Sequence, residues 1–333
     1  MRGIGKGETM ITEPTVFVLG AGASKPYGYP TGSDLRGEIL ASFLSAYDRV
    51  FPTEGIVDEW KVPVSVARRE VPRFLERFGG SHVPSIDLFL AGHPDDLWLN
   101  RLGRLAIILR ILTAENKHSV KGAKEDWCEF LLGKLRGGLI TPDDFKSRFC
   151  ENNVTIITFN YDRFLEQFLF DGLQKSFGGL EPETVKEQLG HIKIVHVFGQ
   201  IAPLPWQMEQ SGVGVEYGRD IGRVNVLLLS ETLRIIYDGY QNPELEEART
   251  KIAEASRIFF LGFGYAEENL KVLALPKVKK PAAARIWGTH LGATEKQCDD
   301  KERQLIRDAG LGGIAMVKLD SKCDCLQLLR EYF

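Results

Sequence analysis

The sequence lacks the paired cysteines that would stabilise a small secreted domain or hold a structural metal ion. It contains five cysteines among 333 residues, an odd number, and no Cys-x-x-Cys pair occurs. A disulfide framework needs an even number of cysteines, and a four-cysteine zinc site needs paired Cys-x-x-Cys elements. Cys323 and Cys325 are close in sequence, but such a pair supplies at most two metal ligands. We therefore predict reduced cysteines and no bound metal.

A large excess of charge and long apolar runs are also missing. The 42 lysines and arginines nearly balance the 45 aspartates and glutamates, which gives a net charge of −3. This balance argues against a protein that coats nucleic acid. No apolar run reaches the roughly 18 residues of a membrane span, and the opening residues MRGIGKGETM lack the apolar segment of a signal peptide. We predict a flexible tail over residues 1–13, a cytoplasmic location, and no direct contact with nucleic acid or membranes.

What the sequence does contain is a series of short apolar runs that alternate with helical patterns. Each run is rich in Val, Ile or Phe and is followed by turn residues, which is typical of buried strands. The runs are Val16–Leu19, Val154–Thr158, Lys193–Phe198, Ile258–Gly262, Ala284–Trp287 and Ile314–Leu319. Helices are predicted over Leu35–Tyr47, Phe164–Leu173, Pro243–Ser256 and Thr294–Asp308. This alternation predicts a doubly wound, mainly parallel α/β sheet, which binds ligands beyond the carboxyl ends of its strands.

The stretch from about residue 55 to residue 150 has a different pattern. Apolar residues recur at helical spacing in VARREVPRFLERF, LWLNRLGRLAIILRILTAEN and DWCEFLLGKLRG, with charged residues between them. We predict a helical insertion between the first two strands. A lid or contact surface and a plain structural cap are equally good interpretations of it.

The first strand ends in a turn that is nearly free of side chains, Gly20-Ala-Gly22-Ala-Ser24. Glycine lets a ligand approach the backbone closely, and amides at the start of a helix favour a phosphate. The turn is not the G-x-G-x-x-G fingerprint, because Lys25 occupies the sixth position, and it lacks the Gly-Lys-Ser/Thr of a P-loop. It indicates a nucleotide or phosphate site, with a tight turn for packing as the alternative.

Two polar stretches follow other strands. Thr158-Phe-Asn160-Tyr-Asp162-Arg-Phe-Leu-Glu166 places an amide and a carboxylate two residues apart, so that both can face one edge of the sheet. Taken alone, these residues are better explained if Asn160 ends the strand and Asp162 caps the next helix. His196 lies in the apolar run VHVFG, where a lone histidine is more often a core residue. It becomes a candidate because it shares the carboxyl edge with the other motifs.

Two more strand ends carry small or polar residues, at Gly262-Phe-Gly264 and at Gly288-Thr289. Apolar side chains would pack better at these positions than the residues that occupy them. With the three stretches described above, five strand ends share this property. They predict one long ligand site, of about the size of a dinucleotide.

In their order along the chain, GAGAS with GYP, TFNYDRFLE, HVFG and LGFGY resemble the sirtuin-like (silent information regulator two-like) domain. The resemblance is closest to the NAD-cleaving domains of bacterial antiphage defence systems, of which SIDLFL at Ser85–Leu90 resembles a further motif. It covers about Val16 to Leu319. Protein-deacylating sirtuins differ, because they carry paired Cys-x-x-Cys elements, a Gln where this chain has Phe159, and a direct His-Gly in place of His-Val-Phe-Gly.

The resemblance implies a Rossmann-like domain over residues 14–333, with the helical insertion at about 55–150, and an NAD+ glycohydrolase that releases nicotinamide and ADP-ribose. It implies that Asp162 contacts the nicotinamide carboxamide and that Asn160 orients the ribose or the attacking water. It also implies that His196, as a neutral imidazole, acts as the general base. The NAD+-binding residues that it implies are Gly20, Ala21, Gly22, Ala23, Ser24, Pro30, Thr158, Gly262, Gly264, Asn269, Gly288 and Thr289.

An NADase in the cytoplasm would harm its own host unless it were regulated. The resemblance therefore implies a homo-oligomer, a separate defence protein such as an ATPase or an Argonaute-type sensor, or both. Two other functions fit the same residues: a module that senses NAD+ or ADP-ribose for a partner, and a sirtuin-type NAD-dependent protein deacylase or ADP-ribosyltransferase.

Overall fold

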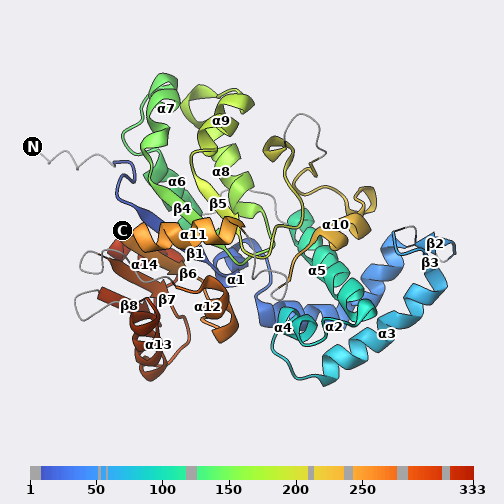
Figure 1. The fold of residues 1–333 in the computed structure, drawn as a ribbon. Helices are drawn as coiled ribbons and strands as arrows, with labels where there is room; N and C mark the ends of the chain where they lie inside the picture. Colours follow the sequence, from blue (N-terminus) through green and yellow to red (C-terminus); the bar gives the residue numbers. More distant parts are fainter. Residues whose placement is uncertain are drawn as a thin grey trace, which may run out of the picture. The chain divides into compact units, whose positions relative to one another are not determined.

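The fold is that of a computed structural model (Figure 1). The structure describes residues 9–51, 54–57, 59–117, 126–208, 214–235, 243–275, 284–309 and 316–333. The chain divides into two compact units: unit 1 takes residues 1–23, 120–197 and 241–333, and unit 2 takes residues 24–119 and 198–240. In the described residues, no helix is long and apolar enough to cross a membrane.

Unit 1 is built on one six-stranded sheet. Its strands are β1 (Thr15–Leu19), β4 (Val154–Thr158), β5 (Lys193–His196), β6 (Arg257–Leu261), β7 (Arg285–Thr289) and β8 (Met316–Asp320). All neighbours pair in parallel, in the order β5-β4-β1-β6-β7-β8. Numbered within the sheet, this is the 3-2-1-4-5-6 order of doubly wound nucleotide-binding sheets. The predicted fold class, α/β with a mainly parallel Rossmann-like sheet, is confirmed.

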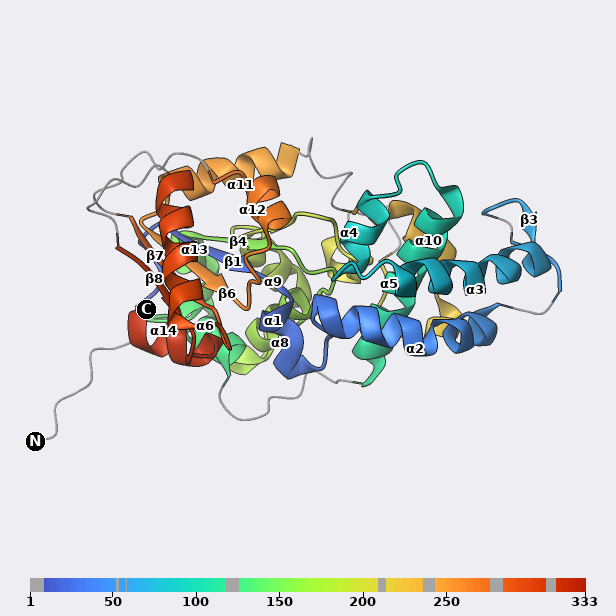
Figure 2. The ribbon, with the colours of Figure 1, turned by 90° about the horizontal axis from the view of Figure 1, so that it is seen from below.

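Helices cover both faces of this sheet, which explains why its central strands read as continuous apolar runs. In Figure 2, α11 and α12 lie on one face, whereas α6, α8 and α14 lie on the other. The helices of unit 1 with eight or more residues are α6 (Trp127–Leu135), α8 (Phe164–Lys175), α9 (Pro182–Leu189), α11 (Pro243–Glu254), α13 (Glu295–Asp308) and α14 (Cys325–Tyr332). The shorter ones are α7 (Pro142–Arg148) and α12 (Glu267–Leu273). Every residue of β1 and β4 is buried as a result.

The predicted elements match the observed ones except near their ends. The run predicted over Lys193–Phe198 pairs as a strand only to His196, and the strand predicted to end at Trp287 continues to Thr289. Of the strand predicted over Ile314–Leu319, the first two residues lie outside the described residues, and the rest belongs to β8, which extends to Asp320. Of the predicted tail, residues 1–8 lie outside the described residues, and Met10 and Ile11 are buried in unit 1.

Unit 2 is helical apart from a short hairpin of β2 (Ile56–Val57) and β3 (Val62–Pro63). Its helices are α2 (Gly32–Val50), α3 (Val64–Gly80), α4 (Ile86–Ala91), α5 (Leu97–Lys117) and α10 (Val226–Thr232). Helix α5 packs against the other four and is apolar around most of its circumference, as a central helix requires. Helix α2 begins at a capping box in which Thr31 and Asp34 exchange hydrogen bonds.

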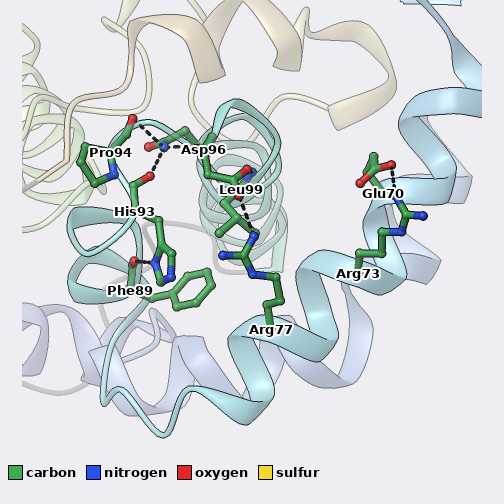
Figure 3. A network of polar contacts seen from close by, with 9 residues as sticks. Glu70, Arg73, Arg77, Phe89, His93, Pro94, Asp96 and Leu99 are labelled. Carbon is green, nitrogen blue, oxygen red and sulfur yellow. Dashed lines mark hydrogen bonds and ion pairs between the residues drawn. The ribbon is translucent and has the colours of Figure 1, made fainter.

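A polar network joins α3 to the loop between α4 and α5 (Figure 3). The Arg77 guanidinium pairs with the Asp96 carboxylate at 2.6 Å, and the second oxygen of Asp96 accepts the Leu99 N–H at 3.1 Å. The His93 ring nitrogen Nδ1 lies 2.8 Å from the Phe89 carbonyl oxygen. Because Asp96 holds both Arg77 and the first turn of α5, it fixes this corner of unit 2.

The range predicted as a helical insertion, about 55–150, contains helices of both units. Helices α3, α4 and α5 belong to unit 2, whereas α6 and α7 belong to unit 1. Unit 2 also takes residues 198–240, which follow β5 in the sequence. Residues 118–125, in the middle of the predicted insertion, lie outside the described residues.

Candidate active site at the carboxyl edge of the sheet

The strand register brings the sequence motifs to one edge of unit 1. Leu19 of β1 is level with Thr158 on one side and with Leu261 on the other. Thr158 is in turn level with His196 of β5. The last residues of four adjacent strands thus form one row, and the residues that follow them share the carboxyl edge, where doubly wound sheets bind ligands.

Asn160 and Asp162 lie directly after β4, and both are only 8% exposed. The Asn160 main-chain N–H donates to the Thr158 hydroxyl at 3.1 Å, and its side-chain amide donates to the Gly20 carbonyl at 3.1 Å. Asp162 Oδ1 accepts the Phe164 N–H at 3.2 Å at the start of α8. The N-cap of α8 is Arg163, so Asp162 binds the first helical N–H from the position before the cap and is not itself the helix cap.

His196 lies beside this loop and has a protein partner at each ring nitrogen. Nδ1 is 3.0 Å from the Asn160 carbonyl oxygen, and Nε2 contacts the Glu166 carboxylate of α8. Burial of the ring disfavours its protonation, but the Glu166 charge and hydrogen bond, the Asn160 carbonyl and the Asp162 charge together outweigh this effect. The pKa of His196 is consequently raised.

This arrangement bears on the predicted role of His196. A carbonyl oxygen only accepts hydrogen bonds, so Nδ1 must carry the proton in its bond to Asn160. Nε2 shares its proton with the Glu166 carboxylate. Neither nitrogen therefore offers a lone pair to a water molecule. The buried partner acid favours the charged ring, whereas the general base that we predicted is a neutral imidazole.

The glycine turn after β1 donates its amides to the protein itself. The Gly20 N–H donates to the Leu261 carbonyl at 3.0 Å, and the Gly22 N–H donates to the Gly262 carbonyl at 3.0 Å. The Ala23 N–H, within the short helix α1 (Ala21–Ser24), donates to the Gly20 carbonyl at 2.9 Å. Three of the five main-chain amides of the predicted phosphate-binding turn Gly20–Ser24 thus have acceptors within the protein.

Close packing of two backbones explains why these positions are glycine. A Cβ atom on Gly20 would lie 2.6 Å from the Gly262 carbonyl oxygen, and one on Gly22 would lie 2.9 Å from the Gly262 Cα. Gly262 itself has φ +57°, and its Cβ would lie 2.0 Å from the Ala23 nitrogen. The turns after β1 and β6 therefore interlock, as the packing alternative for the Gly20–Ser24 turn anticipated.

The remaining predicted positions near β6 and β7 have mixed surroundings. The space over Gly288 is filled by Tyr265, whose hydroxyl would lie 2.0 Å from a Cβ there. The Thr289 hydroxyl accepts the Gly262 N–H at 2.8 Å and so anchors the turn. Gly264 is exposed, and a Cβ on it would meet nothing within 4 Å. Asn269 lies half-buried on α12.

Ser24 and Pro30 belong to unit 2, and both are buried there. Gly28, the first residue of the motif Gly-Tyr-Pro, has φ +87° and ends a short 3-10 helix by donating to the Lys25 carbonyl. This left-handed conformation explains the glycine without a ligand. Ser85 of the SIDLFL motif is the N-cap of α4, since its hydroxyl accepts the Leu88 N–H at 3.3 Å.

Two residues of this edge were not predicted from the sequence. Glu166 is the only acidic residue in the apolar stretch FLEQFLF, and its position in the first turn of α8 was a signal that could have revealed it. Tyr265 directly follows Gly264 and has φ +51°, a conformation that nothing in its sequence pattern indicates. Among the described residues, no group of three His, Cys, Asp or Glu side chains is placed to hold a metal ion.

Comparisons with known proteins bear on this edge. A model of the SIR2-like domain matches residues 154–290, and a comparison with curated protein sequences finds no match. A solved Sir2 homologue mutant in complex with 2′-O-acetyl ADP-ribose is 13% identical, with a TM-score of 0.42 over 98% of this chain and 92% of that chain. A Sir2 mutant with a p53 peptide and NAD is 17% identical, with a TM-score of 0.33 over 95% and 90%. At such TM-scores these two likenesses carry no further conclusion. The SIR2-like match begins at the first residue of β4 and ends just after β7, so it includes Asn160, Asp162 and His196.

Proposed function

We propose that the chain binds NAD+ at the carboxyl edge of the unit 1 sheet and hydrolyses it to nicotinamide and ADP-ribose. The observation that carries this proposal is the convergence of Asn160, Asp162 and His196 beyond adjacent strands of a 3-2-1-4-5-6 sheet. The match of residues 154–290 to the SIR2-like domain supports the choice of NAD+ as substrate.

The chemistry needs few protein groups. The bond between the nicotinamide nitrogen and the ribose C1′ breaks, its electron pair leaves with nicotinamide, and a water oxygen bonds to C1′ while its proton is released. Because nicotinamide leaves from a cationic ring, the ribose passes through an oxocarbenium-like state, as in glycoside cleavage. The protein must hold the sugar and the water in line rather than supply a strong nucleophile.

Asn160 and Asp162 are suited to these tasks. The Asp162 carboxylate, which lies just after β4 at the carboxyl edge of the sheet, would accept a hydrogen bond from the nicotinamide carboxamide. Asn160 would orient the ribose or the water, and its backbone is held firmly enough to do so. We no longer assign proton abstraction to His196, because both its nitrogens are engaged with protein atoms.

The diphosphate of NAD+ would lie near Gly264, where the sheet order reverses between β1 and β6. Gly264 has open surroundings, in contrast to the interlocked Gly20, Gly22 and Gly262. The other predicted NAD+ residues, and the extent of the SIR2-like domain over residues 14–333, belong to the same proposal.

As its biological role we propose depletion of NAD+ in bacterial antiphage defence. The resemblance of the sequence motifs supports this role, in which a homo-oligomer or a separate sensor protein keeps the enzyme silent until infection. Because assembly into a homo-oligomer depends on protein concentration, the test is run with the intact chain at several protein concentrations.

The test measures nicotinamide release from NAD+ by chromatography, for the wild type and for Asn160→Ala. We expect the wild type to release nicotinamide and Asn160→Ala to be slower by about 10²-fold or more, because lost orientation costs about that much. The matched control is Asn153→Ala, since Asn153 is an exposed asparagine before the opposite end of β4. This variant should keep the wild-type rate.

The alternatives give different results. Saturable NAD+ binding by calorimetry with no release of nicotinamide would contradict hydrolysis and favour a sensor of NAD+ or ADP-ribose. Release that depends on an acyl-lysine peptide, or a mass increase of one ADP-ribose on a protein, would favour the sirtuin-type deacylase or the transferase.

A further inference from the structure

The buried carboxylate of Glu166 has no part in the proposed reaction as described so far. The residue is 2% exposed and lies in the first turn of α8, where Leu165 and Phe168 are also buried. Burying a carboxylate is costly unless it is paired and hydrogen-bonded. Its partner here is His196 Nε2. A buried acid beside the candidate site therefore needs a reason to be there.

Glu166 is the first member of a chain of hydrogen bonds across three elements. Its carboxylate contacts Nε2 of His196 on β5, and Nδ1 of the same ring donates to the Asn160 carbonyl after β4. The Asn160 side-chain amide then donates to the Gly20 carbonyl after β1. The chain thus runs from α8 to the middle of the carboxyl edge.

The consequence for Asn160 is that both of its main-chain polar groups are fixed. The N–H is held by the Thr158 hydroxyl, and the carbonyl is held by the His196 ring. The ring can hold it only in one orientation and with Nδ1 protonated. Glu166 sets both conditions, because it binds the opposite nitrogen of the ring and carries the charge that favours its protonation. The other acid that acts on this ring is Asp162.

We propose that Glu166 is a positioning residue, which acts through His196 to hold Asn160 in place for the substrate. This inference rests on the proposed function, because it assigns a role within the same site. Glu166 itself contacts a protein side chain, so its effect should appear in the rate of the bound complex more than in the affinity for NAD+.

The first experiment compares Glu166→Gln and Glu166→Ala with the wild type in kcat and KM for NAD+. The glutamine oxygen can still accept from Nε2, so Glu166→Gln should lose less activity than Glu166→Ala. We expect kcat to fall by about 10²-fold in Glu166→Ala, with KM within about 3-fold of the wild type. The control is Glu183→Gln, which removes one charge from an exposed first-turn glutamate of α9.

A double substitution separates positioning from a merely structural effect. An asparagine at position 196 can place its amide where His196 Nδ1 lies, and it does not need Glu166 for this purpose. We expect His196→Asn to keep part of the activity and Glu166→Gln to cost nothing further in that background, so that the two effects are not additive. Full additivity would overturn the proposal.

A spectroscopic readout works even if the chain does not cleave NAD+. Nitrogen-15 NMR of the histidine rings, with His196 assigned by the His196→Asn variant, reports whether both nitrogens carry protons. We expect a doubly protonated His196 ring in the wild type and loss of one proton at a lower pH in Glu166→Gln. An unchanged ring signal in Glu166→Gln would overturn the inference. Inactive wild type with the expected ring signal would instead contradict the proposed function alone.

Discussion

The two halves of the carboxyl edge of the sheet are built in different ways. Beyond β4 and β5, polar side chains with small exposure are joined by hydrogen bonds, from Glu166 through His196 to Asn160. Beyond β6 and β7, glycines interlock with neighbouring backbone, and the ring of Tyr265 fills the space over Gly288. The first half has groups that can act on a substrate. The second half is packed mainly against itself.

This difference changes what a small residue at a strand end means. Five strand ends lacked large apolar side chains in the sequence, and one long ligand site was the simplest explanation. In the structure, the absence of a side chain at Gly262 and Gly288 makes room for protein atoms. Gly264, by contrast, has open surroundings. The sequence alone does not show whether a glycine makes space for a ligand or for a neighbouring segment of the protein.

The largest effect should come from adding a methyl group where the turns interlock. In Gly262→Ala the new Cβ would lie 2.0 Å from the Ala23 nitrogen, at a residue with φ +57°. Left-handed backbone and overlap with immovable main-chain atoms together should cost about 3 kcal/mol or more of unfolding free energy. Urea denaturation followed by circular dichroism measures this loss, and poor expression of folded protein would be its extreme form.

Gly264→Ala is the matched control, two residues further along the same turn. Its Cβ would meet nothing within 4 Å, so its unfolding free energy should change by less than about 0.5 kcal/mol. If this stable variant binds NAD+ more weakly in calorimetry, Gly264 borders the ligand. Equal destabilisation of the two variants would show that the contrast between interlocked and open glycines is wrong.

The fold could be predicted from the sequence because it depends on patterns that extend over many residues. Apolar runs followed by turn residues identified the six strands of the sheet, and the capping box at Thr31 begins a helix that was expected from its apolar spacing. Asn160 and His196 were found because each follows or ends such a run. These features are local, so that one segment at a time is enough to reveal them.

The partners of the site residues could not be predicted, because they depend on contacts between distant segments. Glu166 and His196 are separated by 30 residues, and the apolar spacing of α8 does not show that an acid faces β5. The raised pKa of His196 follows from that contact and could not be expected without it. The same holds for Gly22 and Gly262. Neither position has room for a Cβ atom, and this becomes evident only when β1 and β6 pair and bring the two turns together.

A second prediction concerns the stability of the packed half, at Gly288 and Tyr265. In Gly288→Ala the new Cβ would meet the Tyr265 hydroxyl at 2.0 Å, which should cost about 1–3 kcal/mol. That hydroxyl is buried and has no hydrogen-bond partner within the described residues, and burial raises its pKa well above the usual value. Tyr265→Phe alone should therefore stabilise unit 1 by about 1 kcal/mol. The double variant should recover part of the loss, as measured by urea denaturation.

Tyr47→Phe provides the control for this cycle. Tyr47 lies in unit 2, and its buried hydroxyl also lacks a hydrogen-bond partner among the described residues. Its removal should add independently to Gly288→Ala, whereas the removal of the Tyr265 hydroxyl should couple to it by about 1 kcal/mol. If Tyr265→Phe is also additive, the ring does not occupy the space over Gly288.

The smallest expected effect is a pH dependence of the unfolding free energy that comes from His196 in the polar half. Because folding raises the pKa of His196, the folded state binds the ring proton more tightly than the unfolded state does. The contribution of this ring to stability is therefore complete below the unfolded pKa of about 6.5 and is lost as the pH rises through the folded pKa. Urea denaturation from about pH 5.5 to about pH 9 should show a declining difference between wild type and His196→Asn.

Glu166→Gln should reduce that decline. The Glu166 charge is the main attraction that raises the pKa of the His196 ring against the lowering effect of burial. His191→Asn, at an exposed histidine just before β5, controls for the removal of one imidazole and should leave the wild-type decline in place. A flat difference between wild type and His196→Asn over the whole range would mean that the ring is neutral when folded. That outcome would contradict the charged ring that the contact with Glu166 favours.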